Sequence, residues 1–318
     1  MRNTGFDIFV ITFHVVLTLT TWFGNCLVCA VIWRTRALRT VPNMIIFSLA
    51  FADLLMTVVF VYRVVNLISS EEIHSTCHVI SELAFCTICV IILHLTAISI
   101  DRFIAIRFPL RYKPIVTGKR TKIALVCIWI LPTIGTVVSP HSLPDAEYED
   151  FVDYYDSFHL CFSYHAHQFQ NTSKVFAAII ISIYIVLPWL VTVSSYMYIL
   201  KVSRDQQLKL KHDAHLEGER VRKLEIRVAI TYGIIIGAFM ACFLPLLIGT
   251  LYQQFIDNDE REEMVHVMKI LLLIASVSAC INPMVYTWRN QEFRKAFKKI
   301  FKRRNEETGN ELTTFSRY

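Results

Sequence analysis

Charged residues are scarce in this chain, and long apolar runs stand where a soluble protein would carry charge. Of its 318 residues only 18% are charged and 54% are hydrophobic, and the mean hydropathy is +0.46. This composition predicts an integral membrane protein. Alternating ten-residue strands are also absent, which excludes a membrane β-barrel. Because the lipid-embedded backbone must satisfy its own hydrogen bonds, the sequence predicts an all-α bundle of spanning helices.

Cysteines suited to a disulfide are equally few. Seven of the nine lie within apolar runs, where cysteine behaves as a small buried hydrophobe; they are Cys26, Cys29, Cys86, Cys89, Cys127, Cys242 and Cys280. The remaining two are Cys77, at the start of an apolar run, and Cys161, in a polar loop. We therefore expect one bridge between Cys77 and Cys161 on the outer side of the membrane.

Acidic residues are missing from two loops, and this asymmetry indicates the orientation. Seven apolar segments are expected to cross the membrane, at residues 7–33, 41–67, 77–104, 121–140, 174–200, 228–255 and 264–287. The loops after the first and third segments and the linker 201–227 are basic, whereas the other loops are rich in Asp and Glu. The positive-inside rule then predicts a multi-pass plasma-membrane protein with its N-terminus outside and its C-terminus inside. Because the bases flank apolar runs, nucleic acid is not an expected partner.

The polar stretches outside these segments support the same orientation. Asn171, followed by Thr172 and Ser173, is a glycosylation acceptor in the long second external loop. Residues 290–302 alternate apolar and basic faces, which predicts an eighth, amphipathic helix on the inner leaflet. Residues 305–318 are polar and are expected to form a disordered tail, leaving 1–304 as the seven-helix domain.

Ordered motifs make the chain resemble rhodopsin-like (class A) G-protein-coupled receptors from about Trp22 to Phe301. The motifs are Gly24-Asn25, Leu49-Ala50-Phe51-Ala52-Asp53, Asp101-Arg102-Phe103, Trp129, Pro188, Tyr196, Cys242-Phe243-Leu244-Pro245 and Asn282-Pro283-Met284-Val285-Tyr286. The tripeptide Val116-Thr117-Gly118 is most similar to adenosine receptors. The resemblance implies a receptor, not an enzyme, that passes the binding of an external small molecule to a heterotrimeric G protein. Arrestin and a receptor kinase are further implied partners.

The inner half of such a receptor is expected to carry the signal. Glu225 lies twenty residues before Pro245, which is about 30 Å along a helix. A charge-assisted pair between Glu225 and Arg102 would therefore clamp the inner ends of the third and sixth helices. The resemblance implies that Leu110 packs into the G protein. It also assigns Asp101, Tyr196, Asn282, Pro283 and Tyr286 to activation and coupling, and Ile92, Pro188 and Phe239 to a core trigger.

Asp53 is a carboxylate in the middle of an apolar run, where ionised groups are costly and usually functional. The resemblance implies that Asp53 and Asn282 help to hold an allosteric sodium ion; no other cofactor is expected. Ile91 and Ser278 replace two of the usual ligands of that ion, which weakens the expectation. Phe243 stands where the family usually has a tryptophan toggle.

Departures from the family pattern limit the ligand. Ala84 stands where amine receptors carry an aspartate counter-ion, so a buried ammonium would lack its partner. Ser276 stands where opsins carry the retinal-binding lysine, which excludes a Schiff base there. Thr250, Leu247 and Ser276 replace the purine-binding residues of adenosine receptors, so adenosine-like ancestry is better supported than adenosine binding.

The expected cavity suits a largely uncharged or nucleoside-like small molecule. Its predicted lining is Ala84, Phe85, Ile88, Ile181, Tyr184, Phe243, Leu246, Leu247, Thr250, Leu272 and Ser276. Three alternatives stay open: an amine-type receptor, a ligand-independent constitutive receptor, and a transporter or channel. A transporter is expected to show internal repeats and several ionisable residues near the midplane. The candidates that we identify for such a path are Asp53 and His94.

Overall fold

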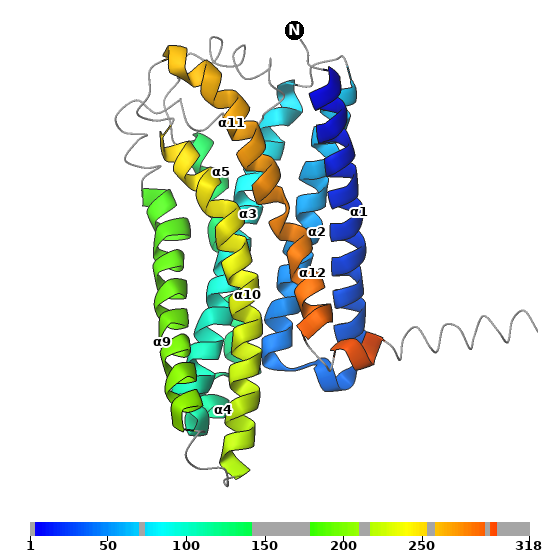
Figure 1. Cartoon of the computed structure of the whole chain (residues 1–318). Coiled ribbons are helices and arrows are strands. Elements are labelled where there is room, and N and C mark those ends of the chain that lie inside the picture. The colour runs from blue at the N-terminus through cyan, green and yellow to red at the C-terminus, as the bar shows by residue number, and fades with distance from the viewer. Residues whose placement is uncertain are drawn as a thin grey trace, which may run out of the picture.

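The computed structural model describes residues 4–69, 74–141, 179–209, 217–252, 258–289 and 293–297. Long helices stand side by side along one common axis (Figure 1). They are α1 (Thr4–Arg34), α2 (Val41–Ile68), α3 (His74–Arg107), α5 (Gly118–His141), a π-helical stretch η4 (Ser182–Val186) that continues into α9 (Leu187–Lys209), α10 (Glu217–Tyr252), α11 (Asn258–Ser276) and α12 (Ser278–Arg289). The short elements are η1 (Arg36–Leu38), η2 (Pro109–Arg111) and α4 (Tyr112–Ile115).

The predicted all-α bundle is confirmed, because six of the seven apolar segments each fall on one of these helical units and the seventh falls on α11 and α12. Among the described residues, six spans are long and apolar enough to cross a membrane. The fourth predicted segment lies on α5, which is not one of these six. The ends of several helices differ from the predicted bounds, such as the end of α9 at Lys209 instead of residue 200, and two differences are larger. The helix α10 begins at Glu217, before the apolar segment at 228, because the residues between are strong helix formers such as Glu, Arg, Lys and Leu.

The seventh segment is the second difference, since it is broken at Val277 into α11 and α12. The amide of Val277 donates to the carbonyl of Ile274 at 3.2 Å, and the amide of Cys280 donates to the Val277 carbonyl at 3.1 Å. These tighter i to i+3 bonds replace the helical pattern. The hydroxyl of Ser278 also bonds a carbonyl one turn back, that of Ala275, at 2.7 Å, which favours a local bend.

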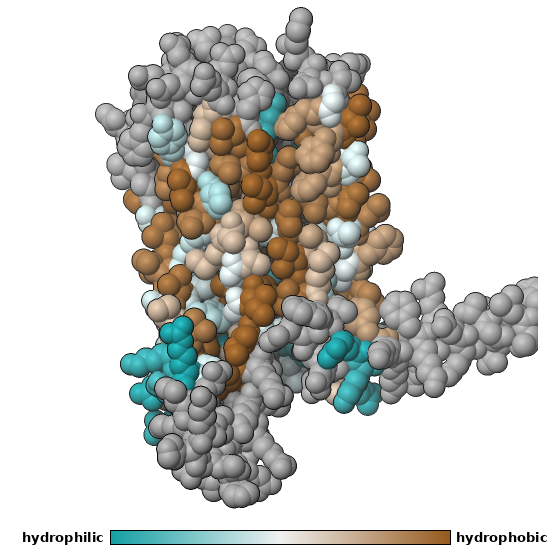
Figure 2. All heavy atoms as spheres, viewed as in Figure 1, coloured by the Kyte–Doolittle hydropathy of each residue, from teal (hydrophilic) through white to brown (hydrophobic). Residues whose placement is uncertain are grey.

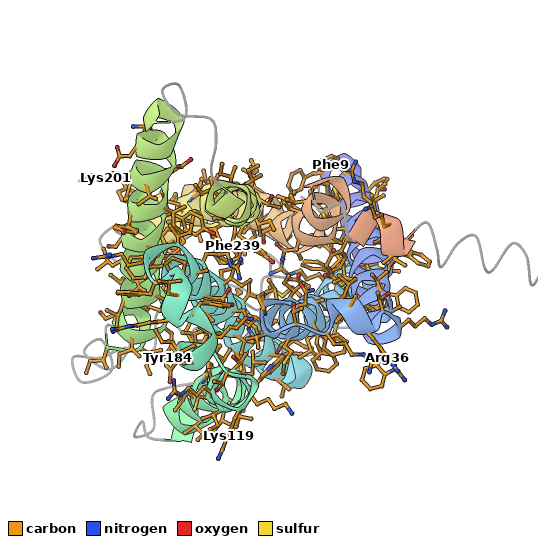
Figure 3. The ribbon with its side chains drawn as sticks, turned by 90° about the horizontal axis from the view of Figure 1, so that it is seen from below. Phe9, Arg36, Lys119, Tyr184, Lys201 and Phe239 are labelled. Atoms are coloured by element: carbon orange, nitrogen blue, oxygen red, sulfur yellow. The ribbon has the colours of Figure 1, made fainter. Side chains whose placement is uncertain are left out.

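The central element is α3. Of its most apolar 18 residues 67% are buried inside the protein, against 33% for α1 and 17% for the span from Ile179 to Asp205. It contacts α2, α5, α9 and α10. Phe239 of α10 belongs to the same core, and Figure 3, seen along the bundle from below, labels it near the middle of the ring of helices. The core therefore lies on α3.

The outer surface is apolar around the waist and basic at one end. Large hydrophobic side chains such as Trp22, Phe23 and Trp33 are exposed, and brown apolar residues dominate the middle of the face in Figure 2. Figure 3 labels Arg36, Lys119 and Lys201 on the rim. They lie just after α1, at the start of α5 and near the end of α9, which is the end of the bundle opposite the start of α1 (Figure 1). We call this the basic end. An apolar waist of this kind faces lipid, as in a multi-pass membrane protein.

A close approach of α1 and α12 explains why glycine and asparagine occur together early in the chain. A Cβ atom on Gly24 would lie 2.6 Å from Cγ of Pro283, so only glycine fits. Pro283 has no N–H to donate to the carbonyl of Ala279 four residues earlier. The Asn25 side-chain amide donates to that carbonyl at 3.3 Å instead. Gly24 thus allows α1 and α12 to pack closely, and Asn25 satisfies a backbone carbonyl that would otherwise lack a partner inside the membrane.

The predicted eighth helix is described only at residues 293–297, which are helical. Phe293 is fully buried and packs in the main core with Ala296 and, at its edge, Phe297. Arg294 and Lys295 are exposed. In this turn Phe293 and Ala296 therefore pack against the protein, and the contact of the helix with the inner leaflet stays a prediction.

Candidate signalling and ligand sites

A buried ion pair closes α3 at the basic end. The guanidinium of Arg102 contacts the carboxylate of Asp101, with Nε donating to Oδ2 at 2.8 Å. The Tyr112 hydroxyl donates to the other carboxylate oxygen, Oδ1, at 2.7 Å. The guanidinium also lies 5.6 Å from the ring centre of Tyr232 on α10, a cation–π distance. Both charged residues are buried, so their charges are balanced within the protein.

The same ion pair anchors the loop that follows α3. Tyr112 opens α4 directly after η2, and its bond to Asp101 fixes η2 beside the end of α3. Leu110 in η2 is 96% exposed. An anchored loop therefore presents one bare leucine at the basic end.

The predicted partner of Arg102 lies beyond what the structure describes. The backbone of Glu225 is part of α10, but its side chain is not among those described. Glu225 precedes Tyr232 by seven residues, about 10 Å further toward the basic end. The helices α3 and α10 contact one another, so Glu225 and Arg102 lie on adjacent helices. The ion pair between their side chains stays a prediction.

Tyr196 on α9 faces the same junction. Its ring lies against Gly233 of α10, whose added Cβ would approach Cε1 to 2.9 Å. Its hydroxyl is buried without a hydrogen-bond partner in the part of the chain that the structure describes. Arg102 is an electrostatic neighbour of that hydroxyl. A buried unsatisfied hydroxyl costs about 1 to 3 kcal/mol, so a rearrangement that supplies a partner is favoured.

Asp53 and Asn282 meet in the middle of the bundle. The Asn282 amide donates to Oδ2 of Asp53 at 2.8 Å. Among the described residues the other oxygen, Oδ1, has no partner although Asp53 is fully buried. An orphaned carboxylate oxygen suits a cation such as sodium, but Ile91 adds no ligand, and no group of three or more His, Cys, Asp or Glu residues gathers in the described ranges. The sodium site stays a prediction.

Two of the three predicted trigger residues are connected by one threonine that the sequence reading missed. The hydroxyl of Thr96 reaches the carbonyl of Ile92 at 2.9 Å and that of Pro188 at 3.3 Å. It lies 3.1 Å from the hydroxyl of Thr192. Ile92 and Phe239 are both buried in the main core. Thr96 therefore ties α3 to the start of α9 beside the apolar contact with α10.

A second polar junction missed by the sequence reading joins three helices. Nε2 of His94 on α3 is 2.8 Å from the hydroxyl oxygen of Ser48 on α2. The indole N–H of Trp129 on α5 donates to the same oxygen at 2.9 Å. Both ring nitrogens of His94 have hydrogen-bond partners, since Nδ1 lies 2.8 Å from the carbonyl oxygen of Val90. His94 is thus a structural link of the bundle rather than a member of an ion path.

The model of a protein family described as "7 transmembrane receptor (rhodopsin family)" matches residues 24–286. The chain belongs to the rhodopsin family of seven-transmembrane receptors. It is similar to the histamine H2 receptor of Cavia porcellus, with 27% identity over 306 residues, covering 95% of this chain and 81% of the relative. The human adenosine receptor A2a is 30% identical over 319 residues, covering 92% of this chain and 72% of the relative. The receptor is therefore neither an enzyme nor, by family, a transporter.

The predicted ligand-cavity residues of the receptor fall into two groups. Leu246 and Leu272 pack against each other in a cluster between α10 and α11, and Ala84 and Ile88 are buried on α3. Six of the remaining predicted residues are half-buried: Phe85, Ile181, Tyr184, Phe243, Leu247 and Thr250. The last one, Ser276, is buried. The hydroxyls of Thr250 and Ser276 donate to carbonyls of their own helices.

Tyr184 and Phe243 have specific contacts within the receptor. The Tyr184 hydroxyl donates to the carbonyl of Leu131 on α5 at 2.9 Å, which holds the ring at the α5 interface. The ring of Phe243 stacks on that of Phe239, with centres 4.8 Å apart and planes 12° apart. Phe243, in place of the family's tryptophan, is therefore in direct contact with the trigger.

Several predicted residues lie outside the described part of the receptor. Cys161, Asn171 and the tail 305–318 are not described. Cys77 and Tyr286 are placed in the helices α3 and α12, but their side chains are not described. The disulfide, the glycosylation and the role of Tyr286 stay predictions.

The sequence reading also missed ionisable residues in the membrane segments, where it named Asp53 and His94 alone. His14 of α1 is buried, and Arg63 of α2 and Glu82 of α3 are half-buried. A single base inside the apolar segment 41–67 was a visible signal for Arg63. The set of ionisable residues named from the sequence was therefore incomplete, although the family match still excludes a transporter.

Proposed function

We propose that this receptor lies in the plasma membrane with α1 starting outside, and that it transmits the binding of an extracellular small molecule to a heterotrimeric G protein at the basic end. The observation that carries the proposal is the buried pair of Asp101 and Arg102, beside which Leu110 stands almost fully exposed. A buried ion pair beside an exposed leucine suits a docking surface that becomes accessible when the receptor is activated.

The proposed switch is a change of partners for Arg102. In the closed arrangement the guanidinium is held by Asp101 and lies over Tyr232. Release from this arrangement would bring it toward the Tyr196 hydroxyl, which is buried and unsatisfied among the described residues. The predicted clamp with Glu225 holds α10 against α3 until the ligand binds. Movement of α10 then exposes the surface that takes the G protein, and later arrestin and a receptor kinase.

For the ligand we propose a molecule with a largely uncharged, nucleoside-sized body. Ala84 and Ile88 on α3 and Leu272 on α11 offer it apolar surface, and few polar groups are needed to orient such a body. An amine is the second candidate, because relatives named histamine H2 receptor match most of the chain. Ala84 argues against it, since the expected counter-ion is missing. The third alternative is a receptor that signals constitutively and needs no ligand.

The coupling proposal can be tested without knowing the ligand. Glu225→Ala should raise basal signalling in cells with cyclic-nucleotide and calcium reporters. A clamp of about 1 to 3 kcal/mol shifts the ratio of active to inactive receptor roughly five- to 150-fold. Adding Leu110→Ala to Glu225→Ala should return the signal toward baseline at equal surface expression. Leu131→Ala, which removes an exposed leucine from the waist, is the matched control and should leave the raised signal intact.

Two outcomes would contradict the coupling proposal. One is a basal signal that falls in Glu225→Ala. The other is an equal loss of signal from Leu110→Ala and Leu131→Ala, because a docking knob must matter more than a leucine that faces lipid. Ion flux without any G-protein response would overturn the proposed function as a whole.

A further inference from the structure

Arg63 is a cation inside a membrane helix without a partner among the described residues. It lies five residues before the end of α2 and is half-buried. In the described part of the chain no ion pair or hydrogen bond involves its guanidinium. An arginine near a helix end can extend to the membrane surface. Such an arginine would be exposed, whereas Arg63 is partly enclosed by the bundle.

The neighbour of Arg63 is a second unsatisfied polar group. His14 on α1 is only 3% exposed, and Arg63 is its electrostatic neighbour. Its ring lies 5.8 Å from that of Phe60, which is one turn from Arg63 on α2. Nδ1 of His14 lies 2.9 Å from the carbonyl of Val10 and so donates to it. Nε2 is buried and has no partner among the described residues.

Helix geometry gives the level of this pair along the bundle axis relative to the predicted cavity. The contact of Ser48 with His94 marks one level of the bundle. Ala84 lies ten residues outward from His94, about 15 Å, and Arg63 lies fifteen residues outward from Ser48, about 22 Å. The guanidinium is therefore roughly 7 Å outside the level of Ala84, one and a third helical turns. A single small molecule spans that difference.

Two other charged residues also lie in the outer half of the bundle. Glu82 on α3 and Lys269 on α11 each have a further contact within the protein. Oε1 of Glu82 is nevertheless buried without a hydrogen-bond partner among the described residues, whereas Arg63 is a cation for which no ion pair or hydrogen bond is described. A buried or half-buried guanidinium binds planar or tetrahedral anions through its fork of N–H donors.

We propose that the ligand of this receptor carries an acidic group, a carboxylate or a phosphate, which binds Arg63 at the outer rim while its uncharged body lies along the apolar lining. Nε2 of His14 accepts a hydrogen bond from a hydroxyl or a water next to that group. The inference deepens the proposed function and rests on it, because it names the chemical class of the ligand. It also distinguishes this receptor from amine receptors, whose ligand has the opposite charge.

Thermal unfolding of the purified full chain in detergent tests the inference directly. The probes are octanoate, 3-phenylpropionate and phenyl phosphate, each compared at millimolar concentration with a neutral partner: methyl octanoate, methyl 3-phenylpropionate or phenol. The acids should raise the melting temperature, because a ligand that binds only the folded state stabilises it. The neutral partners should not. Comparing the melting-temperature shifts given by the two carboxylates and by phenyl phosphate shows which kind of anion the site prefers.

Variants assign the effect to Arg63. Arg63→Gln should weaken acid binding roughly ten- to hundredfold, the effect of losing a charge-assisted contact. Arg63→Lys should keep part of the acid preference and shows that the position tolerates substitution. Arg34→Gln, at the basic end of α1, is the matched control and should keep the full shift. A shift that persists in Arg63→Gln would overturn the inference, as would acids and neutral partners acting equally on the unmodified protein.

Failure of this inference can be told apart from failure of the proposed function. If no acid stabilises the protein but Glu225→Ala raises basal signalling, then the inference about Arg63 fails and the coupling proposal stands. If acids stabilise the protein through Arg63 and no G-protein response follows in cells, the anion site stands and the proposed function falls.

Discussion

Gly24 is the position at which the structure makes its sharpest steric prediction. An alanine there would place Cβ 2.6 Å from Cγ and 2.9 Å from Cβ of Pro283. Carbon atoms in contact lie about 3.5 to 4.0 Å apart, so α1 and α12 must separate by about 1 Å. The bond from Asn25 to the Ala279 carbonyl is already 3.3 Å long, and the same movement would break it.

The magnitude follows from three contributions. Overpacking a tight contact costs about 1 to 3 kcal/mol, and leaving the Ala279 carbonyl unsatisfied costs about 1 to 3 kcal/mol more. Alanine in place of glycine in a helix returns up to about 1 kcal/mol. We therefore expect Gly24→Ala to destabilise the receptor by about 1 to 6 kcal/mol. Gly237 in α10 has nothing within 4 Å of an added Cβ, so Gly237→Ala should be neutral or stabilising.

The two variants should be compared by thermal unfolding in the same detergent, with surface expression as a second measure. Gly24→Ala should melt several degrees below Gly237→Ala. Gly249→Ala is an intermediate case, because its added Cβ meets the mobile ends of Leu271 and Met268. Equal melting temperatures for Gly24→Ala and Gly237→Ala would refute the close contact of α1 with Pro283.

Three further predictions concern single bonds of the receptor. Cys77→Ala and Cys161→Ala should each reduce surface expression, with the double variant no worse than either single one; normal expression in both singles would exclude a structural bridge. Tyr112→Phe should raise basal signalling at equal expression, because it removes the 2.7 Å bond that holds the Asp101 carboxylate; an unchanged or lowered basal signal in the reporter assay would show that this bond does not hold the closed state. Thr96→Val should lower thermal stability by about 1 to 2 kcal/mol in free energy of unfolding, and an unchanged melting temperature would mean that its bonds to α9 do not persist.

The helices were predictable because lipid leaves the backbone few choices. The apolar segment 41–67 coincides with α2 to within one residue at its end, since an apolar run of that length must satisfy its own amides and carbonyls. The start of α10 was not predictable in the same way. Hydropathy locates a boundary with lipid, whereas Glu217 lies in a polar stretch whose helical structure depends on intrinsic propensity.

The cross-helix bonds were not predictable, and Thr96 shows the reason. Thr96 and Thr250 both bond the carbonyl four residues back in their own helices, as such residues commonly do in membrane helices. Thr96 also reaches the Pro188 carbonyl on another helix. Nothing in the local sequence separates the two cases, because the difference lies in what packs beside the hydroxyl. Arg63, by contrast, was visible as a base inside an apolar run and was overlooked.

The kinds of contact that hold each helix favour α10 as the element that moves. Directional side-chain bonds join α1 to α12 through Asn25, α2 to α12 through Asp53 and α3 to α9 through Thr96. Among the contacts of α10 with the core are rings and apolar side chains, such as Phe239 in the main cluster and Tyr232 against Arg102, and Thr231 and Tyr232 also have further contacts within the protein. Apolar contacts are not directional and can be exchanged for similar ones as a helix slides. Hydrogen bonds must be broken outright, so the polar links resist movement and the predicted clamp of Arg102 with Glu225 is left to set the balance of α10.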